Sequence, residues 1–187
     1  MKRCYIVGIG SDIAQGIKPM LERDGWSVNG AGHGRMVSKP WDLIIFACGT
    51  LAPIGYFFSI CDYAWRAGVV SNSLAVLANL RAAWPLRGPH PVVIFFGGPN
   101  MAKPSPTYTA YRAGKAMLES LVSTLNVEYP ECKFAMLHPG VVRTKIHQQT
   151  IAAGSRAANF ERVQKIVSGE EQTVSMEKVY GKLKELL

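Results

Sequence analysis

A tyrosine followed four residues later by a lysine is the feature of this sequence that could do chemistry. Residues four apart lie on one face of a helix, so the two side chains would be neighbours. An ammonium group about 5 Å from a phenol, in an effective dielectric near 20, is worth roughly 3 kcal/mol, or about two pKa units. The pattern therefore predicts a phenol more acidic than an ordinary tyrosine, which could act as a general acid.

The pattern occurs three times: Tyr111 with Lys115, Tyr129 with Lys133, and Tyr180 with Lys184. In the second pair the tyrosine is followed directly by Pro130, which ends a helix and separates the two side chains. The third pair lies in the predicted terminal helix, away from the expected ligand. The first pair lies on an uninterrupted predicted helix, so we assign the chemistry to Tyr111 and Lys115.

A glycine-containing loop follows a strand-like run, residues 3–7, and precedes a helical pattern over 13–23. Glycines in such a loop let the backbone approach a pyrophosphate, which free N–H groups and the helix dipole then hold. The loop reads Gly8-Ile9-Gly10-Ser11-Asp12-Ile13-Ala14. A tight strand-to-helix turn capped by Asp12 would look similar, so the loop alone leaves both interpretations open.

Short apolar runs of strand length alternate with longer helical patterns along the chain. The runs that predict strands are 3–7, 26–31, 43–47, 92–96 and 133–137. Helical spacing predicts helices over 13–23, 63–84, 109–129 and 170–187. This alternation is typical of a Rossmann-like α/β fold, a doubly wound and mainly parallel sheet in three α/β/α layers. Such a sheet binds its ligand at the carboxyl ends of the strands.

Composition favours one folded domain over residues 1–187. Of the 187 residues, 48% are hydrophobic and 18% are charged, which is enough to bury a core and excludes a disordered chain or a small disulfide scaffold. The cysteines, Cys4, Cys48, Cys61 and Cys132, lack the spacing of a metal site. We therefore expect no metal and a reduced, cytoplasmic location.

The formal charge of +8 favours an anionic partner. No basic run carries interleaved aromatic residues, so we do not expect nucleic-acid binding. Residues 43–60 are free of charge, but Gly49, Pro53 and Gly55 interrupt them, and a strand followed by a loop and a helix start explains the run without a membrane. Nucleotides and phosphorylated small-molecule substrates remain as partners that this charge would suit, and the charge does not choose between them.

Over residues 3–144 the order of motifs resembles the short-chain dehydrogenase/reductase family. The family loop T-G-x-x-x-G-x-G is matched as Val7-Gly8-x-x-x-Asp12-Ile13-Ala14, which keeps the first glycine. The family motif N-N-A-G appears as Phe46-Ala47-Cys48-Gly49, and Asn72 stands where the family has its helix asparagine. Residues 111–115 match Y-x-x-x-K, and residues 139–144 match P-G-x-x-x-T.

The resemblance implies an NAD(P)-dependent oxidoreductase that interconverts a carbonyl and an alcohol by hydride transfer. Tyr111 would donate the proton, Lys115 would hold the nicotinamide ribose, and Asn72 would support a proton-relay water. The residues expected to bind the cofactor are Gly8, Gly10, Ser11, Asp12, Ile13, His33, Arg35, Ala47, Cys48, Gly49, Lys115, Pro139, Gly140, Val142 and Thr144.

The end of the second predicted strand bears on the choice of cofactor, because NAD-binding proteins place a carboxylate there. Residues 29–35 contain no acid, and His33 and Arg35 could meet a 2′-phosphate, so we expect NADP rather than NAD. The same residues could instead form a solvated turn.

The loop Gly8-Ile9-Gly10 also resembles that of methyltransferases. The absence of a carboxylate after the second predicted strand argues against that class.

The main departure from the family lies thirteen residues before Tyr111, where the family serine donates a hydrogen bond to the substrate oxygen. This chain has Gly98 there. Removing such a donor commonly costs about 100- to 1000-fold in rate. The alternative prediction is therefore a catalytically impaired dinucleotide-binding sensor or scaffold protein.

The chain is short for this family. Too little sequence separates residues 31 and 43 for the usual helix and third strand, and no final strand follows the terminal helix. Residues 145–165 fall where the family covers its substrate, so we expect a substrate lid there, with an ordinary surface helix as the alternative. The helices 63–84 and 109–129 correspond to the family's subunit interface, which predicts a homodimer or homotetramer.

Overall fold

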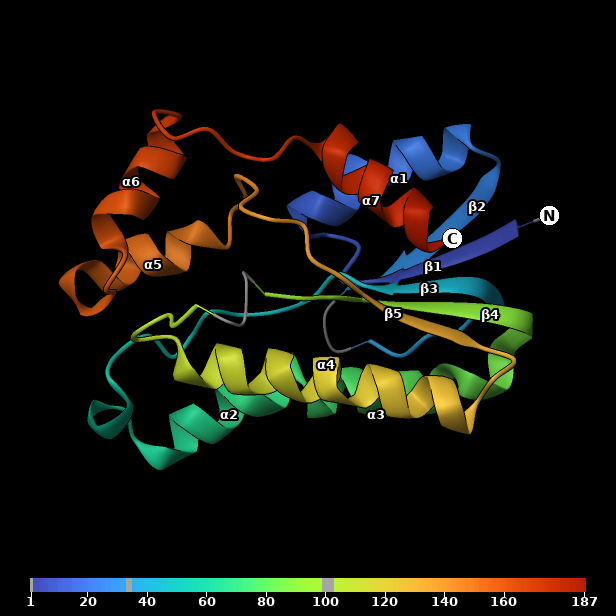
Figure 1. The fold of residues 1–187 in the computed structure, drawn as a ribbon, viewed down its shortest axis with the longest axis horizontal. Helices are drawn as coiled ribbons and strands as arrows, with labels where there is room; N and C mark the ends of the chain where they lie inside the picture. The colour runs from blue at the N-terminus through green and yellow to red at the C-terminus, as the bar shows by residue number, and fades with distance from the viewer. Residues whose placement is uncertain (1, 33–34, 99–102) are drawn as a thin grey trace.

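The computed structural model describes residues 2–32, 35–98 and 103–187, which form a five-stranded sheet with all neighbouring strands parallel (Figure 1). The strand order is β2-β1-β3-β4-β5. The strands are β1 (Lys2–Val7), β2 (Trp26–Ala31), β3 (Trp41–Phe46), β4 (Arg87–Phe96) and β5 (Lys133–Leu137). This confirms the predicted Rossmann-like α/β class.

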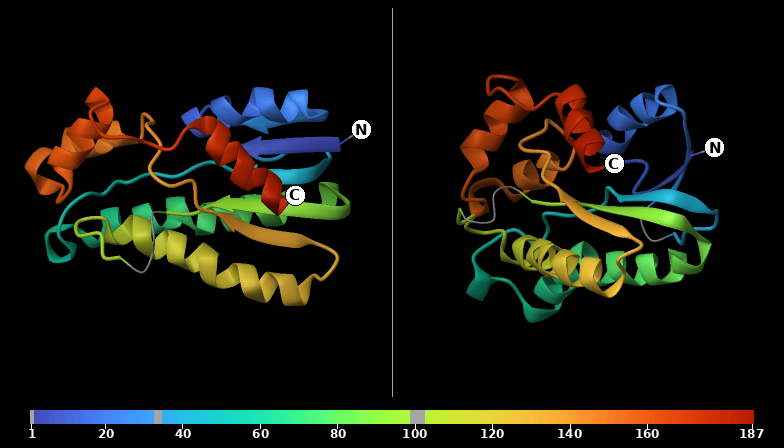
Figure 2. Two further views of the ribbon diagram at one scale, coloured as in Figure 1. Left: turned by 45° about the horizontal axis from the view of Figure 1, so that its top comes forward. Right: turned by 45° about the vertical axis from the view of Figure 1, so that its right-hand side comes forward.

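Helices cover both faces of the sheet in three layers (Figure 2). One face carries α1 (Asp12–Arg23) and α7 (Met176–Leu186). The other carries α2 (Asp62–Asn72), α3 (Leu74–Ala83) and α4 (Thr109–Glu128). Because successive strand residues point to opposite faces, Ile6 of β1 packs in the first core and Tyr5 and Val7 pack in the second.

Two predicted helices differ from the structure. The helix expected over 63–84 is interrupted at Ser73, whose backbone is non-helical and whose hydroxyl donates to the Val69 carbonyl at 2.7 Å. The terminal helix begins at Met176 rather than 170, because Ser175 caps it by accepting a hydrogen bond from the Lys178 amide.

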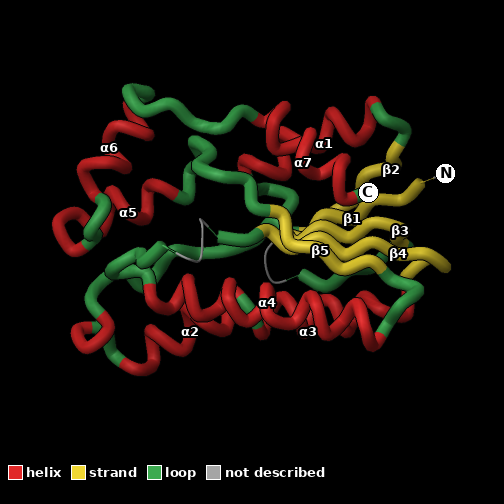
Figure 3. Tube along the Cα trace, viewed as in Figure 1, coloured by secondary structure: helices red, strands yellow, loops and turns green. Residues whose placement is uncertain are grey.

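Long loops and two further helices stand beyond the carboxyl ends of the strands (Figure 3). The helices are α5 (His147–Ala153) and α6 (Phe160–Ser168), which fill most of the segment predicted as a lid. Between β2 and β3 the described residues form neither helix nor strand, and no strand follows β5 in the described part of the chain. None of the helices described is long and apolar enough to cross a membrane.

Two glycines let α2 and α4 approach closely beneath this end of the sheet. A Cβ at Gly114 of α4 would lie 2.6 Å from the Asn72 Cβ and 3.1 Å from the Val69 carbonyl oxygen. A Cβ at Gly68 of α2 would lie 3.0 Å from the Ala110 Cβ of α4 and 2.8 Å from the Ala52 carbonyl oxygen. Neither position can accept a side chain unless the backbone moves.

We predict that Gly114→Ala lowers the free energy of unfolding by about 1–2 kcal/mol, because the steric cost of overpacking exceeds the gain in helix propensity. Gly181→Ala in α7 is the matched control, since no atom lies within 4 Å of a Cβ there. It should raise the free energy of unfolding by roughly 0.5–1 kcal/mol. Urea unfolding of both variants measures this. Equal changes in the two variants would show that the close contact does not constrain the helices.

Candidate functional site

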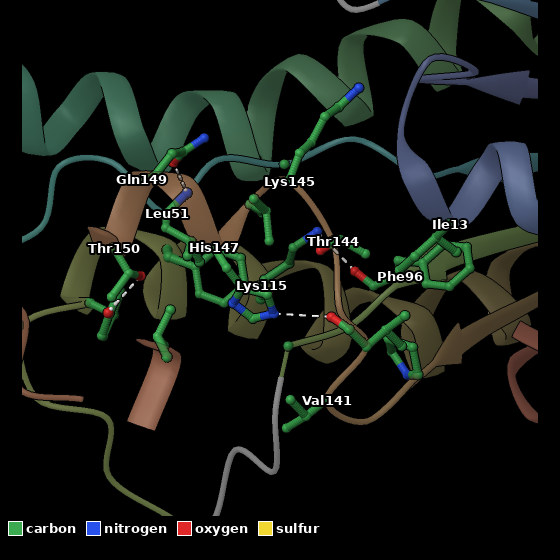
Figure 4. Close-up of a pocket in the computed structure, with 18 of the residues that line it drawn as sticks. Ile13, Leu51, Phe96, Lys115, Val141, Thr144, Lys145, His147, Gln149 and Thr150 are labelled. Atoms are coloured by element: carbon green, nitrogen blue, oxygen red, sulfur yellow. Dashed lines mark hydrogen bonds between the residues drawn. The ribbon is translucent and has the colours of Figure 1, made fainter. Parts of the chain in front are cut away.

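A cavity of about 550 Å³ opens at the carboxyl ends of the strands, bounded by the start of α1, by α4 and by α5 and α6 (Figure 4). The predicted site residues that line it are Ser11, Asp12, Ile13, Ala47, Cys48, Gly49, Tyr111, Lys115, Pro139, Gly140, Val142 and Thr144. Gly8, Gly10 and Asn72 do not line it. Arg35 is exposed outside it, and His33 lies outside the described residues.

Lys115 is buried at the centre of this end of the sheet, with 4% of its surface exposed. Its Nζ donates to the Phe96 carbonyl at 2.8 Å and to the Cys48 carbonyl at 3.4 Å. These carbonyls lie at or just beyond the ends of β4 and β3, and Figure 4 shows the first of the two contacts. Because burial disfavours the charged amine, the pKa of Lys115 falls to about 8.

Tyr111 lies one helical turn before Lys115, and the Lys115 Nζ is 5.9 Å from the centroid of its ring. Burial raises the pKa of Tyr111 to about 12, and the neighbouring Arg112 guanidinium offsets this only in part. Burial thus outweighs the nearby cations, and the Tyr111 phenol is less acidic than an ordinary tyrosine, contrary to the expectation that Lys115 makes it acidic. The same burial removes water from both groups and favours the neutral form of each.

Asn72 is fully buried at the end of α2 and holds the loop that follows β3. Its Nδ2 donates to the carbonyls of Thr50 at 2.9 Å and Gly68 at 2.8 Å, and its Oδ1 accepts from the Thr50 amide at 3.1 Å. A Cβ at Gly49 would lie 3.1 Å from this Oδ1 and 3.5 Å from the Lys115 Nζ. Asn72 thus fixes the loop beside Lys115, and its proton-relay role stays a prediction.

Gly98 lies directly beside the phenol of Tyr111. A Cβ at position 98 would be 3.3 Å from the Tyr111 hydroxyl oxygen and 3.2 Å from its Cε1. A serine hydroxyl at this position would therefore stand next to the phenol. The glycine leaves that place without a hydrogen-bond donor from the side chain.

The glycine loop combines a left-handed turn with a close approach of the backbone to the end of β3. Gly8 has φ +85°, and a Cβ there would lie 3.0 Å from the carbonyl carbon and oxygen of Ala47. The cap of α1 is Ser11, whose Oγ accepts from the Ala14 amide at 3.2 Å, and not Asp12. The loop therefore has the tight turn that both earlier interpretations required.

Asp12 is engaged by the chain that follows β5. Its carboxylate accepts a hydrogen bond from the Lys145 amide, and the Lys145 Nζ lies 3.9 Å from Asp12 and donates to the Gly10 carbonyl at 2.6 Å. A carboxylate at the start of α1 would repel a pyrophosphate, and the Lys145 ammonium opposes that repulsion. Both charges line the cavity.

Sequence analysis missed the residues that fasten α5 over the cavity. Gln149 Oε1 accepts from the Leu51 amide at 2.7 Å, a contact visible in Figure 4, and from the Ala52 amide at 3.1 Å. The Tyr108 hydroxyl contacts the Thr150 hydroxyl at 3.0 Å. These partners are far apart in the chain, so their spacing gave no signal. The segment predicted as a lid is a hydrogen-bonded wall of the cavity in this structure.

Solved structures share this fold at low sequence identity. A short-chain dehydrogenase/reductase from Saccharomyces cerevisiae matches with a TM-score of 0.79 and 16% identity, over 94% of this chain and 86% of that chain. The enzyme KRED1-Pglu matches with a TM-score of 0.83 and 18% identity, over 100% and 94% of the two chains. A small-chain dehydrogenase in complex with NADPH matches with a TM-score of 0.80 and 13% identity, over 98% and 90%.

No protein-family model matches the chain, and no curated protein matches it significantly in sequence. The likeness therefore lies in the fold, which is that of the short-chain dehydrogenases/reductases.

We predict that the buried Lys115 makes stability rise with pH between 8 and 10.5. The folded pKa of about 8 lies below the ordinary value of 10.5, so in this window the unfolded chain binds a proton that the folded chain does not. The free energy of unfolding should then increase by about 3 kcal/mol relative to Lys115→Met, which lacks the amine. Below pH 8 the difference between the two proteins should be constant. Urea unfolding across this range measures the difference, and a constant difference up to pH 10.5 would show that the folded amine titrates like an exposed lysine.

Proposed function

We propose that the protein is an NADP-dependent oxidoreductase that interconverts a carbonyl and an alcohol by hydride transfer. The observation that carries the proposal is the placement of Tyr111 and the buried Lys115 on one helix, both lining a cavity at the carboxyl ends of a parallel sheet. The turn at Gly8 and the start of α1 stand at the same edge. This arrangement combines a proton donor with a place for a dinucleotide.

The residues present fit a nicotinamide dinucleotide. Lys115 would hold the hydroxyl groups of the nicotinamide ribose, and the backbone amides at the start of α1 would hold the pyrophosphate. Residues 139–144 would contact the nicotinamide itself. The bound cofactor supplies the hydride.

The protonation state of Tyr111 favours the reductive direction at neutral pH. With a pKa of about 12, the phenol keeps its proton and can donate it to a carbonyl oxygen. The reverse reaction needs the phenolate as a base, which this burial disfavours. A positive charge close to the phenol, such as that of Arg112, lowers the pKa of Tyr111 and so favours the phenolate.

The surroundings of β2 support NADP over NAD. The described residues 29–32 and 35 contain no carboxylate, and Arg35 is exposed near the end of the strand. Lys39 reaches the same strand, donating from Nζ to the Asn29 Oδ1 at 2.9 Å. Cations of this kind suit a 2′-phosphate. A protein of the same fold has been solved with NADPH.

We further propose a homodimer or homotetramer that packs through α2, α3 and α4. Large apolar side chains are exposed on these helices: Tyr63, Val70, Leu74, Met117 and Val127. Burying them between subunits would stabilise an assembly. A monomer in sedimentation analysis at micromolar concentration would exclude it.

The four cysteines are free thiols, which supports a cytoplasmic location.

We predict that Tyr111→Phe lowers turnover of carbonyl substrates at least about 100-fold and leaves NADPH affinity within a few-fold, because only the proton donor is lost. Tyr180→Phe is the matched control, since this tyrosine also precedes a lysine by four residues but donates to Asp24 away from the cavity. Oxidation of NADPH measures turnover, and fluorescence titration measures binding. Unchanged turnover in Tyr111→Phe would refute the assigned role.

A second candidate function is a dinucleotide-binding protein without turnover, favoured by the missing donor at Gly98. Under it the purified protein binds NADPH and oxidises none with any carbonyl compound. We predict that Gly98→Ser brings NADPH oxidation about 10- to 100-fold above the background rate of the wild-type protein, because the new hydroxyl would stand beside that of Tyr111. Gly98→Ala places the same Cβ without a hydroxyl and should bring no gain. Equal rates in the two variants would show that a donor at this position does not limit the reaction.

A further inference from the structure

One lysine of the cavity wall lies against the glycine loop and was not among the predicted site residues. Lys145 lines the cavity shortly before α5, and its Nζ donates to the Gly10 carbonyl at 2.6 Å. In Figure 4 its side chain extends away from that of Lys115, which contacts the carbonyls at the ends of β3 and β4. The charge of Lys145 is therefore placed at the start of α1 and not at the proposed ribose site.

The Lys145 ammonium group keeps hydrogen-bond donors for a ligand. An ammonium group has three N–H donors, and the Gly10 carbonyl takes one of them. The Asp12 Oδ1 lies 3.9 Å from Nζ, which is too far for a hydrogen bond. The Asp12 carboxylate instead accepts a hydrogen bond from the backbone amide of Lys145. The Lys145 side chain is 67% exposed, so little packing opposes its movement toward a ligand.

The first backbone amides of α1 also point to an anion. The Ala14 amide donates to the Ser11 Oγ, but the amides of Asp12 and Ile13 have no hydrogen-bond partner within the described part of the chain. A Cβ at Gly10 would meet no atom within 4 Å, so the space beside the loop is open. Amides at the start of a helix that lack partners are suited to phosphate oxygens.

The charge of Asp12 works against such an anion. It is the only carboxylate among the described residues that line the cavity, and it stands in the first turn of α1. Its full negative charge outweighs the favourable partial charge of the helix start, which is about half an elementary charge. A phosphate group held by the two amides alone would therefore face a net negative charge. The Lys145 ammonium brings a full positive charge to the same place, and lysine binds phosphate as a point charge.

From these contacts we infer that Lys145 binds the pyrophosphate of the dinucleotide directly and does not serve only to neutralise Asp12. The inference rests on the proposed function, because the pyrophosphate belongs to the proposed cofactor. The phosphate oxygens would accept hydrogen bonds from the Lys145 Nζ and from the amides of Asp12 and Ile13. The hydrogen bond from the Lys145 amide to the Asp12 carboxylate keeps the lysine beside the glycine loop.

Calorimetric titration with NADP⁺ tests this inference in two backgrounds. Lys145→Met should weaken the binding of NADP⁺ about 10- to 100-fold, because a charge-assisted hydrogen bond is lost. The same substitution in Asp12→Asn, which has no carboxylate to neutralise, should again weaken binding at least about 10-fold. Lys145→Arg keeps the charge and should retain most of the affinity. If Lys145→Met has no effect in the Asp12→Asn background, the lysine only neutralises Asp12 and the inference is overturned.

The matched control for net charge is Lys18→Met. Lys18 lies on α1 outside the cavity and pairs with Glu22 at 2.7 Å. This variant loses the same single charge and should leave the affinity for NADP⁺ unchanged. Thermal unfolding of each variant checks that the protein is folded. If Lys18→Met and Lys145→Met weaken binding equally, the effect belongs to the overall charge, and the inference fails.

Two fragments of the cofactor show which phosphate Lys145 contacts. 2′-Phospho-ADP-ribose contains the pyrophosphate and the 2′-phosphate, whereas adenosine 2′-monophosphate contains only the 2′-phosphate. Lys145→Met should weaken the binding of the first fragment as much as that of NADP⁺ and leave the binding of the second unchanged. Equal losses for the two fragments would assign the lysine to the 2′-phosphate and overturn the inference.

These binding measurements separate the inference from the proposed function. If 2′-phospho-ADP-ribose binds in a manner that depends on Lys145, but NADPH is oxidised with no carbonyl compound, the pyrophosphate site stands and the proposed function fails. If carbonyl compounds are reduced with NADPH and Lys145→Met binds NADP⁺ as tightly as the wild-type protein, the proposed function stands and the inference is overturned. A wild-type protein that binds neither ligand would contradict both.

Discussion

The burial of one lysine amine at the carboxyl end of the sheet is the constraint on which the rest of the site depends. Lys115 has lost its water, and the hydrogen bonds to the carbonyls of Phe96 and Cys48 replace only part of that hydration. Those carbonyls lie where the hydrogen-bonded pairing of β3 and β4 with their neighbouring strands ends. They therefore need hydrogen-bond donors from outside the sheet. Fixing the amine there places α4, and with it Tyr111, against the cavity. The close packing at Gly114 and the loop held by Asn72 maintain this geometry.

The burial that assembles the site also sets its electrostatics. A lysine with a pKa of about 8 and a tyrosine with a pKa of about 12 are both shifted toward their neutral forms. At neutral pH the Tyr111 phenol therefore keeps its proton, and it is a weaker acid than an ordinary tyrosine. The Arg112 guanidinium offsets the effect of burial on the pKa of Tyr111 only in part.

Much of the fold could be predicted because four of the five strands, all except β2, contain a continuous apolar run, and all five predicted strands overlap the observed ones. The resemblance to the family singled out position 98, and the structure shows that Gly98 lies beside Tyr111. Other features depend on contacts that spacing does not encode. The break at Ser73 comes from a side chain bonding its own helix, and Gln149 binds loop residues almost one hundred positions away. The effect of burial on the pKa of Tyr111 could not be predicted either. The sequence shows that Lys115 is near, but it does not show that both side chains are excluded from water.

The most direct test of the account is a crystal structure of the protein with NADP⁺ bound. It predicts electron density for the dinucleotide along the carboxyl ends of β1, β3 and β4, with the pyrophosphate at the start of α1 and the nicotinamide ribose within hydrogen-bond distance of the Lys115 Nζ. It also predicts that the Tyr111 hydroxyl faces the space in front of the nicotinamide ring. A dinucleotide bound elsewhere, or a cavity that stays empty at saturating NADP⁺, would contradict the central claim.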